Sequence, residues 1–104
     1  MRKMIEVELK GIELVGVQEV QVNKFGRATP MNVVLFGSNE EARQYVNKSI
    51  QQLKDYYGYG ENSVVEVKEE NPITNIWRVH VEYHDELDED KFEIIYKVSN
   101  AYLQ

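Results

Sequence analysis

A repeated alternation of apolar and polar residues is the feature that most limits the folds open to this chain. The segment NIWRVHVEY, residues 75–83, places four large apolar side chains on one side of an extended backbone: Trp77, Val79, Val81 and Tyr83. KFEIIYKV, residues 91–98, alternates in the same way. Because successive side chains of a strand point to opposite faces, both segments are predicted to be half-buried strands. A terminal helix is the alternative for the second segment.

Further segments also have the composition of strands. MIEVEL near the N-terminus alternates strictly, and a run over residues 12–22 follows it with Gly16 in its middle, where a bulge or bend is expected. MNVVLF, residues 31–36, has apolar residues on both faces and is predicted to be an interior strand covered on both sides. SVVEVK, residues 63–68, precedes a predicted turn around Asn71 and Pro72.

One segment changes to a helical period. Ser38 and Glu41 have the spacing of a capping box, in which each side chain satisfies a free backbone N–H at the start of a helix. Apolar or small residues then recur at intervals of three and four, namely Ala42, Val46, Ser49, Ile50, Leu53 and Tyr57. Gly58 is a natural C-terminal stop, so a helix is predicted over residues 39–57.

The order of these segments indicates the fold class. Three strands, one helix and three strands follow one another, and the connections between strands are short enough for antiparallel hairpins. The length of 104 residues fits one domain. The sequence therefore predicts a single α+β domain over residues 1–104, in which the helix packs on one face of a mostly antiparallel sheet of about five to six strands.

Composition excludes several classes of function. The net charge is −6, and residues 53–104 carry twelve Asp and Glu against five Lys and Arg. Binding to a phosphate backbone requires clustered cations, so the sequence disfavours nucleic acid and favours a protein partner with a basic surface. The chain has no cysteine and no apolar run near the ~20 residues that span a bilayer, so we expect a cytoplasmic protein without a membrane contact.

The most acidic segment lies between Glu82 and Asp90 and holds six of the eighteen carboxylates. It is no calcium-binding loop, because the sixth position counted from Asp85 is not glycine and the twelfth is not glutamate. Carboxylates so close together repel one another, which favours a role in binding a basic groove. The predicted contact residues are Asp85, Glu86, Asp88, Glu89 and Asp90. A solvated hairpin turn is the alternative.

Two other segments are candidate contacts for a partner. Lys24 and Arg27 flank Phe25 and Gly26 at a predicted hairpin tip, where a cationic and aromatic loop can contact a phosphate, a base or an acidic protein surface. Tyr56, Tyr57 and Tyr59 form a local cluster, and tyrosine is enriched at protein interfaces. The alternatives are an ordinary long hairpin loop for the first segment, and core packing with helix capping for the second.

Metal binding and catalysis find little support in the sequence. His80, Glu82 and His84 share one side of a predicted strand, but the Cα atoms of the two histidines would lie roughly 13 Å apart, too far for one ion. No phosphate-binding glycine loop, nucleophile elbow or zinc-protease motif is present. We therefore expect no bound metal, no cofactor and no enzymatic activity.

The sequence predicts a small, acidic, non-enzymatic protein that binds another protein. One form of this function is an inhibitor that occupies the basic groove of a nucleic-acid-handling enzyme, by analogy of class with small acidic phage proteins that block host nucleases. Two alternatives stay open. One is a self-assembling structural or accessory subunit that forms a homodimer through sheet edges, and the other is a small-ligand or metal-binding module.

Overall fold

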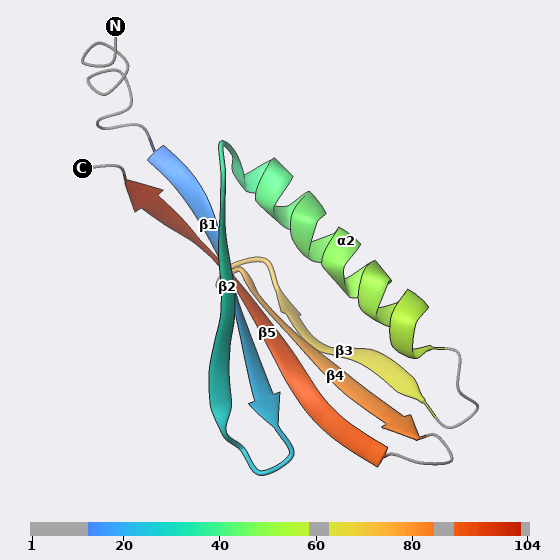
Figure 1. The fold of residues 1–104 in the computed structure, drawn as a ribbon. Helices are drawn as coiled ribbons and strands as arrows, with labels where there is room; N and C mark the ends of the chain where they lie inside the picture. The colour runs from blue at the N-terminus through green and yellow to red at the C-terminus, as the bar shows by residue number, and fades with distance from the viewer. Residues whose placement is uncertain (1–12, 59–62, 85–88, 103–104) are drawn as a thin grey trace, which may run out of the picture.

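The computed structural model describes residues 13–58, 63–84 and 89–102, which form one five-stranded sheet and one helix (Figure 1). All neighbouring strands are antiparallel, and their spatial order is β2-β1-β5-β4-β3. In chain order the elements are β1 (Glu13–Asn23), β2 (Ala28–Phe36), α2 (Asn39–Tyr57), β3 (Val64–Asn71), β4 (Ile76–His84) and β5 (Glu89–Tyr102).

This architecture confirms the predicted α+β class, with the helix lying across one face of an antiparallel sheet. The C-terminal segment is a strand and not a helix, and it occupies the centre of the sheet between β1 and β4. The strand continues to Tyr102, beyond the predicted end at residue 98. The strand predicted for MIEVEL falls among residues 1–12 and lies outside the described residues.

Local signals fix both ends of α2. The Ser38 side chain accepts a hydrogen bond from the Glu41 backbone N–H at 3.2 Å, as the capping pattern predicts. At the other end the Gly58 N–H donates to the Lys54 carbonyl, and a Cβ at Gly58 would collide with that oxygen. The helix therefore begins and ends at the predicted residues.

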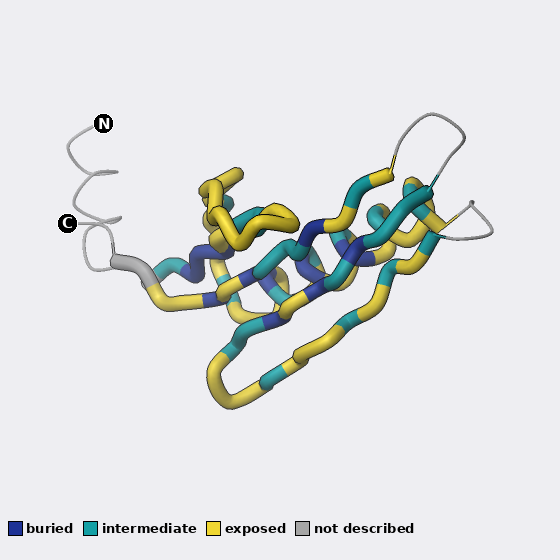
Figure 2. Tube along the Cα trace, turned by 90° about the horizontal axis from the view of Figure 1, so that it is seen from below, coloured by how far each residue is buried: buried dark blue, intermediate teal, exposed yellow. Residues whose placement is uncertain are grey.

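The core lies between α2 and the sheet. The helix contributes Ala42, Val46 and Ile50, while the strands contribute Val15, Val17, Trp77, Val79, Val81, Phe92, Tyr96 and Val98. These strand residues are the alternating apolar positions of β1, β4 and β5, and in Figure 2 buried and exposed segments accordingly alternate along the strands. In the described part of the chain no helix covers the opposite side of the sheet, which we call the open face.

The prediction that residues 31–36 form an interior strand was wrong. β2 is an edge strand that pairs only with β1 among the described strands, and Val33 and Leu35 remain 60% and 52% exposed. Phe36 packs toward the helix side, where it contacts Tyr45. Apolar residues on both faces of β2 thus reflect one face packed on the helix layer and one face left open.

The bulge expected at Gly16 lies elsewhere. Gly16 is in regular register between Leu35 and Ser99, and it is buried. The register shifts further along the strand pair, where Glu19 faces Asn32 and Val20 faces Pro30, so that Met31 has no partner in β1. Pro30 lacks the N–H that a regular ladder requires, which explains why the irregularity falls at this position.

Candidate functional site

One end of the sheet brings together candidate residues that are far apart in the sequence (Figure 1). Antiparallel pairing places Asn23, the last residue of β1, opposite Phe92 on β5. It also places His84, the last residue of β4, opposite Glu89. The β1–β2 turn, the start of β5 and the end of α2 therefore meet at this end.

The β1–β2 turn presents an exposed aromatic ring. The Asn23 side chain accepts hydrogen bonds from the backbone N–H groups of Phe25 and Arg27, at 3.0 and 2.9 Å. Gly26 has φ of 83°, a left-handed conformation that favours glycine. Phe25 is consequently held at the tip with 84% of its surface exposed, and Lys24 Nζ lies 5.5 Å from the ring centroid. The predicted hairpin tip is confirmed.

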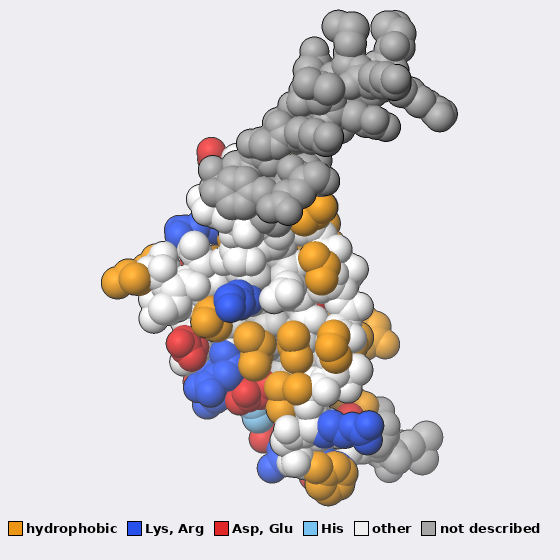
Figure 3. All heavy atoms as spheres, turned by 90° about the vertical axis from the view of Figure 1, so that its left-hand side faces the viewer, with side chains coloured by type: hydrophobic (Ala, Val, Ile, Leu, Met, Phe, Trp, Pro, Cys, Tyr) orange, Lys and Arg blue, Asp and Glu red, His pale blue; other side chains and the backbone are white. Residues whose placement is uncertain are grey.

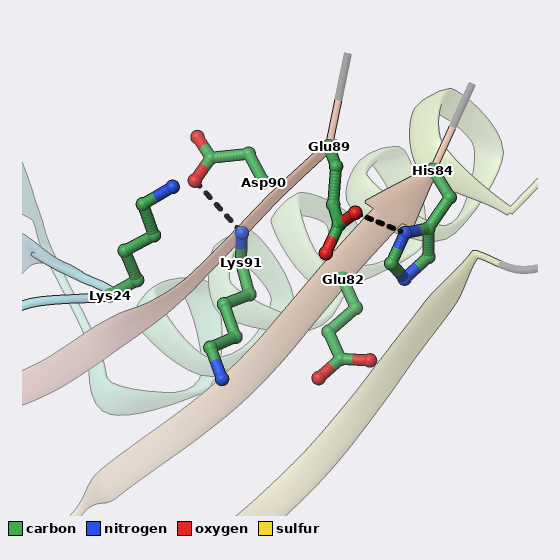
Figure 4. A pocket seen from close by; sticks show the side chains of 6 residues that line it. All are labelled: Lys24, Glu82, His84, Glu89, Asp90 and Lys91. Atoms are coloured by element: carbon green, nitrogen blue, oxygen red, sulfur yellow. Dashed lines mark hydrogen bonds and ion pairs between the residues drawn. The ribbon is translucent and has the colours of Figure 1, made fainter. Parts of the chain in front are cut away.

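A shallow depression beside this turn is lined almost entirely by charged side chains. Its residues are Lys24 from the turn, Glu82 and His84 from β4, and Glu89, Asp90 and Lys91 from β5 (Figure 4). We call this set the charged pocket. Its volume of about 130 Å³ is below the range of roughly 300–1,000 Å³ that encloses small-molecule ligands. Its geometry therefore suits contact with another surface better than enclosure of a ligand.

The histidines of β4 pair with neighbouring carboxylates. His84 Nδ1 lies 3.6 Å from Glu89 Oε2, and His80 Nε2 lies 3.2 Å from Glu82 Oε1. The hydrogen bond from His80 is the main cause that lowers the pKa of Glu82, and the charges of His80, Lys91 and His84 add to it. Glu82 is thus held as a carboxylate at the edge of the pocket.

Charges of both signs meet at the charged pocket, which the sequence did not reveal. Lys24 belongs to the loop that was predicted as a separate cationic contact, yet its side chain extends toward Asp90 (Figure 4). Lys91 faces Glu82 across the β4–β5 pair and was not a predicted site residue. Alternation along residues 91–98 already indicates that the Lys91 side chain faces away from the core. That Lys91 lies beside Glu82 follows only from the pairing register of β4 and β5. Among the described lining residues, two lysines partly offset three carboxylates.

The tyrosines at the end of α2 have different surroundings. The Tyr57 ring stacks on Tyr83 at a centroid distance of 5.3 Å and contacts Phe92 edge-on at 5.7 Å. Burial, followed by the nearby charges of Tyr56 and Asp90, raises the pKa of Tyr57. Tyr57 therefore packs the helix end onto the sheet, whereas Tyr56 is 77% exposed and available to a partner.

Part of the predicted contact set cannot be placed in this geometry. Asp85, Glu86 and Asp88 fall within residues 85–88, and Tyr59 falls within residues 59–62, so all four lie outside the described residues. Glu89 and Asp90 belong to β5 and line the charged pocket. Arg27 closes the β1–β2 turn through its backbone, in which its carbonyl accepts from the Asn23 N–H at 3.0 Å.

The geometry of β4 agrees with the separation argued for its histidines. His80 and His84 lie on the same side of one regular strand, each beside a different carboxylate. Within the described residues, no group of three or more His, Asp or Glu side chains is arranged to hold a metal ion.

Comparison with known proteins adds no assignment. No protein-family model matches the sequence, no curated protein matches it, and no solved structure matches the fold. In the part of the chain that the structure describes, no helix is long and apolar enough to cross a membrane.

Proposed function

We propose that this chain is a small, acidic, non-enzymatic protein that binds another protein through the end of the sheet around the charged pocket. The observation that supports this proposal is the exposed aromatic side chain of Phe25 beside the charged pocket, which its neighbour Lys24 lines. Tyr56, also exposed, lies at the same end of the fold on the helix side of the sheet. Exposed aromatic side chains beside charged residues are typical of protein interfaces.

Charge indicates the kind of partner. In the sequence, the four residues between His84 and Glu89 include three further carboxylates, Asp85, Glu86 and Asp88. Lys24 and Lys91 cannot balance this number of acids. A partner with a basic surface fits this excess, and a basic groove such as that of a nucleic-acid-handling enzyme is the form of partner that we propose. Binding would then block the groove without any chemistry by this protein.

Charge reversal tests this proposal directly. The triple substitution of Asp85, Asp88 and Asp90 to lysine reverses the charge of the acidic segment and changes none of the buried core residues of the described structure. We expect it to abolish capture of the partner from a lysate of the source cells, with each captured protein identified by mass spectrometry. Raising the salt concentration should weaken capture by the unmodified protein, because exposed charges are screened over about 10 Å at 0.1 M.

The control changes the same number of charges elsewhere. Glu66, Glu69 and Glu70 lie exposed on β3, the strand at the opposite edge of the sheet from β2, and do not line the charged pocket. Their triple substitution to lysine gives the same net charge. If the β3 variant loses the partner as completely as the pocket variant does, binding follows net charge alone and the proposed site is wrong. Retention of the partner by the pocket variant would also refute it.

A further inference from the structure

Both histidines of the chain lie beside carboxylates of the charged pocket. His84 lines the pocket, and its Nδ1 lies 3.6 Å from Glu89 Oε2 (Figure 4). His80 is on the same side of β4, and its Nε2 lies 3.2 Å from Glu82 Oε1. Glu82 and Glu89 are two of the three carboxylates among the described lining residues. Each of these two carboxylates therefore has a histidine ring nitrogen as a near neighbour.

Charged side chains surround His80 on the open face of the sheet. Figure 3 looks onto this face and shows histidine beside acidic and basic side chains, next to a band of hydrophobic ones. Strand pairing places Glu66 of β3 and Glu93 of β5 directly opposite His80. The other charged residues that face it, along β4 and across the adjoining hollow, are Glu82, Arg78, Lys91 and Lys24. Among the described neighbours three carboxylates face three basic side chains, so the charge of His80 itself sets the local balance.

The surroundings of His84 are more acidic. Its strand partner is Glu89, and Glu82 lies on the same side of β4. The rest of the described lining is Asp90, Lys91 and Lys24. With both histidines neutral, this lining holds three carboxylates against two lysines, a balance of −1. A charge on His84 brings the balance to 0, and a further charge on His80, which contacts Glu82, brings it to +1.

Histidine is the side chain whose charge ordinarily changes between about pH 5 and 8. Carboxyl and lysine side chains ordinarily titrate near pH 4 and above pH 10, so they keep their charge over most of this range. A protonated ring forms an ion pair with the carboxylate that it already contacts, and that carboxylate is then less available to a cation of a partner. The hydrogen bond from His80 is the main cause that lowers the pKa of Glu82, and the charge of His84 also lowers it. Both histidines therefore act on this one pocket carboxylate.

We propose that the charged pocket is a pH-sensitive contact, in which protonation of His80 and His84 releases a basic partner as the pH falls below about 6.5. This inference rests on the proposed function, because it concerns the regulation of the same site. Repulsion between the partner's cations and the two protonated rings acts in the same direction as the neutralisation of the carboxylates. Conversely, a bound basic partner disfavours protonation of both rings, since the coupling between two binding events is reciprocal.

The first measurement uses a defined probe of a basic surface, a fluorescent peptide of about ten lysines. The charge of this peptide is constant between about pH 5.5 and 7.5. Fluorescence anisotropy at constant ionic strength should give a dissociation constant for the full chain that is roughly tenfold larger at about pH 5.5 than at about pH 7.5. A change of this order is expected when two unit charges are added a few ångströms from a contact in a largely solvated site.

Substitution of both rings removes the titrating groups and keeps a hydrogen-bond donor at each position. His80→Gln places an amide nitrogen near the position of Nε2, and His84→Asn places one near Nδ1. This double variant should bind the probe equally at both pH values. His80→Lys combined with His84→Lys fixes the positive charge, and it should bind as weakly at about pH 7.5 as the unmodified protein does at about pH 5.5. Circular dichroism checks that each variant is folded.

A second measurement observes the rings directly. The chain contains two histidines, so its proton NMR spectrum has two Cε1–H resonances, which the single variants assign. Addition of saturating probe should move the titration of both resonances to lower pH, because binding and protonation oppose each other. A peptide of glycine and serine of the same length is the control and should move neither resonance.

The outcomes separate this inference from the proposed function. If the lysine peptide binds at neither pH, the acidic contact itself is wrong and the inference falls with it. If the peptide binds with equal affinity at both pH values, the pH dependence is wrong while the proposed contact stands. The same conclusion follows if the His80→Gln and His84→Asn double variant loses affinity at low pH as much as the unmodified protein, or if the bound peptide leaves both histidine titrations unmoved.

Discussion

The hydrogen bond between Tyr45 on α2 and Glu19 on β1 gives a direct test of how the helix is fixed on the sheet. The Tyr45 hydroxyl donates to Glu19 Oε1 at 2.6 Å, next to the point where the β1–β2 register shifts. A neutral donor bonded to a charged acceptor contributes ~1.5–3 kcal/mol, and partial exposure of both side chains places this bond near the lower end. We expect an interaction energy of about 1.5 kcal/mol between the two side chains.

A double-mutant cycle isolates this energy. Tyr45→Phe keeps the ring that contacts Phe36 at 5.2 Å and removes only the hydroxyl, while Glu19→Met removes the acceptor at similar volume. The hydroxyl also interacts with the Asn32 and Ser49 side chains, so the single variant alone would overstate the bond to Glu19. Urea unfolding, followed by fluorescence of the single tryptophan, Trp77, gives the free energy of unfolding for each member of the cycle.

The matched control is Tyr56→Phe, which removes a hydroxyl from an exposed tyrosine of the same helix. Its free energy of unfolding should stay within about 0.5 kcal/mol of the unmodified protein, whereas Tyr45→Phe should lower the midpoint of thermal unfolding by roughly 4–8 °C per kcal/mol lost. If the coupling energy between Tyr45 and Glu19 is below about 0.3 kcal/mol, the bond does not fix the helix, and packing alone holds α2 on the sheet.

Four further outcomes are expected. Burial raises the pKa of Tyr96 above its ordinary value of 10.0, so the folded state holds the phenol proton more tightly than the unfolded state does. The contribution of this group to the free energy of unfolding is therefore fully present below pH 10 and should fall as the pH rises above 10. Tyr96→Phe should flatten this fall, measured by urea unfolding at a series of pH values. Val46→Ala opens a cavity in the core and should lower the free energy of unfolding by about 2–3 kcal/mol, whereas Val64→Ala at an exposed site should change it by less than about 0.5 kcal/mol. Ser38→Ala removes the helix cap and should cost about 1 kcal/mol, measured by circular dichroism during thermal unfolding. The purified protein without an affinity tag should contain no stoichiometric zinc, and a zinc affinity that falls on His80→Ala would contradict the strand geometry.

The features that the sequence predicts well are those encoded by neighbouring residues. Ser38, Glu41 and Gly58 mark the ends of α2 within one or two turns of the helix, so no tertiary contact is needed to recognise them. The buried positions of β4 follow from alternation because one face of that strand packs on the helix and the other does not. Periodicity therefore suffices where the local pattern and the tertiary environment agree.

Spatial neighbours are the information that the sequence lacks. β1 pairs with β5, whose residues lie roughly seventy to ninety positions later in the chain, and no local pattern indicates that pairing. The position of β2 at the sheet edge was missed for the same reason, since apolar residues on both faces are equally consistent with a covered strand and an open one. The approach of Lys24 to the acidic residues likewise depends on the β1–β5 register, which sets two oppositely charged candidates side by side.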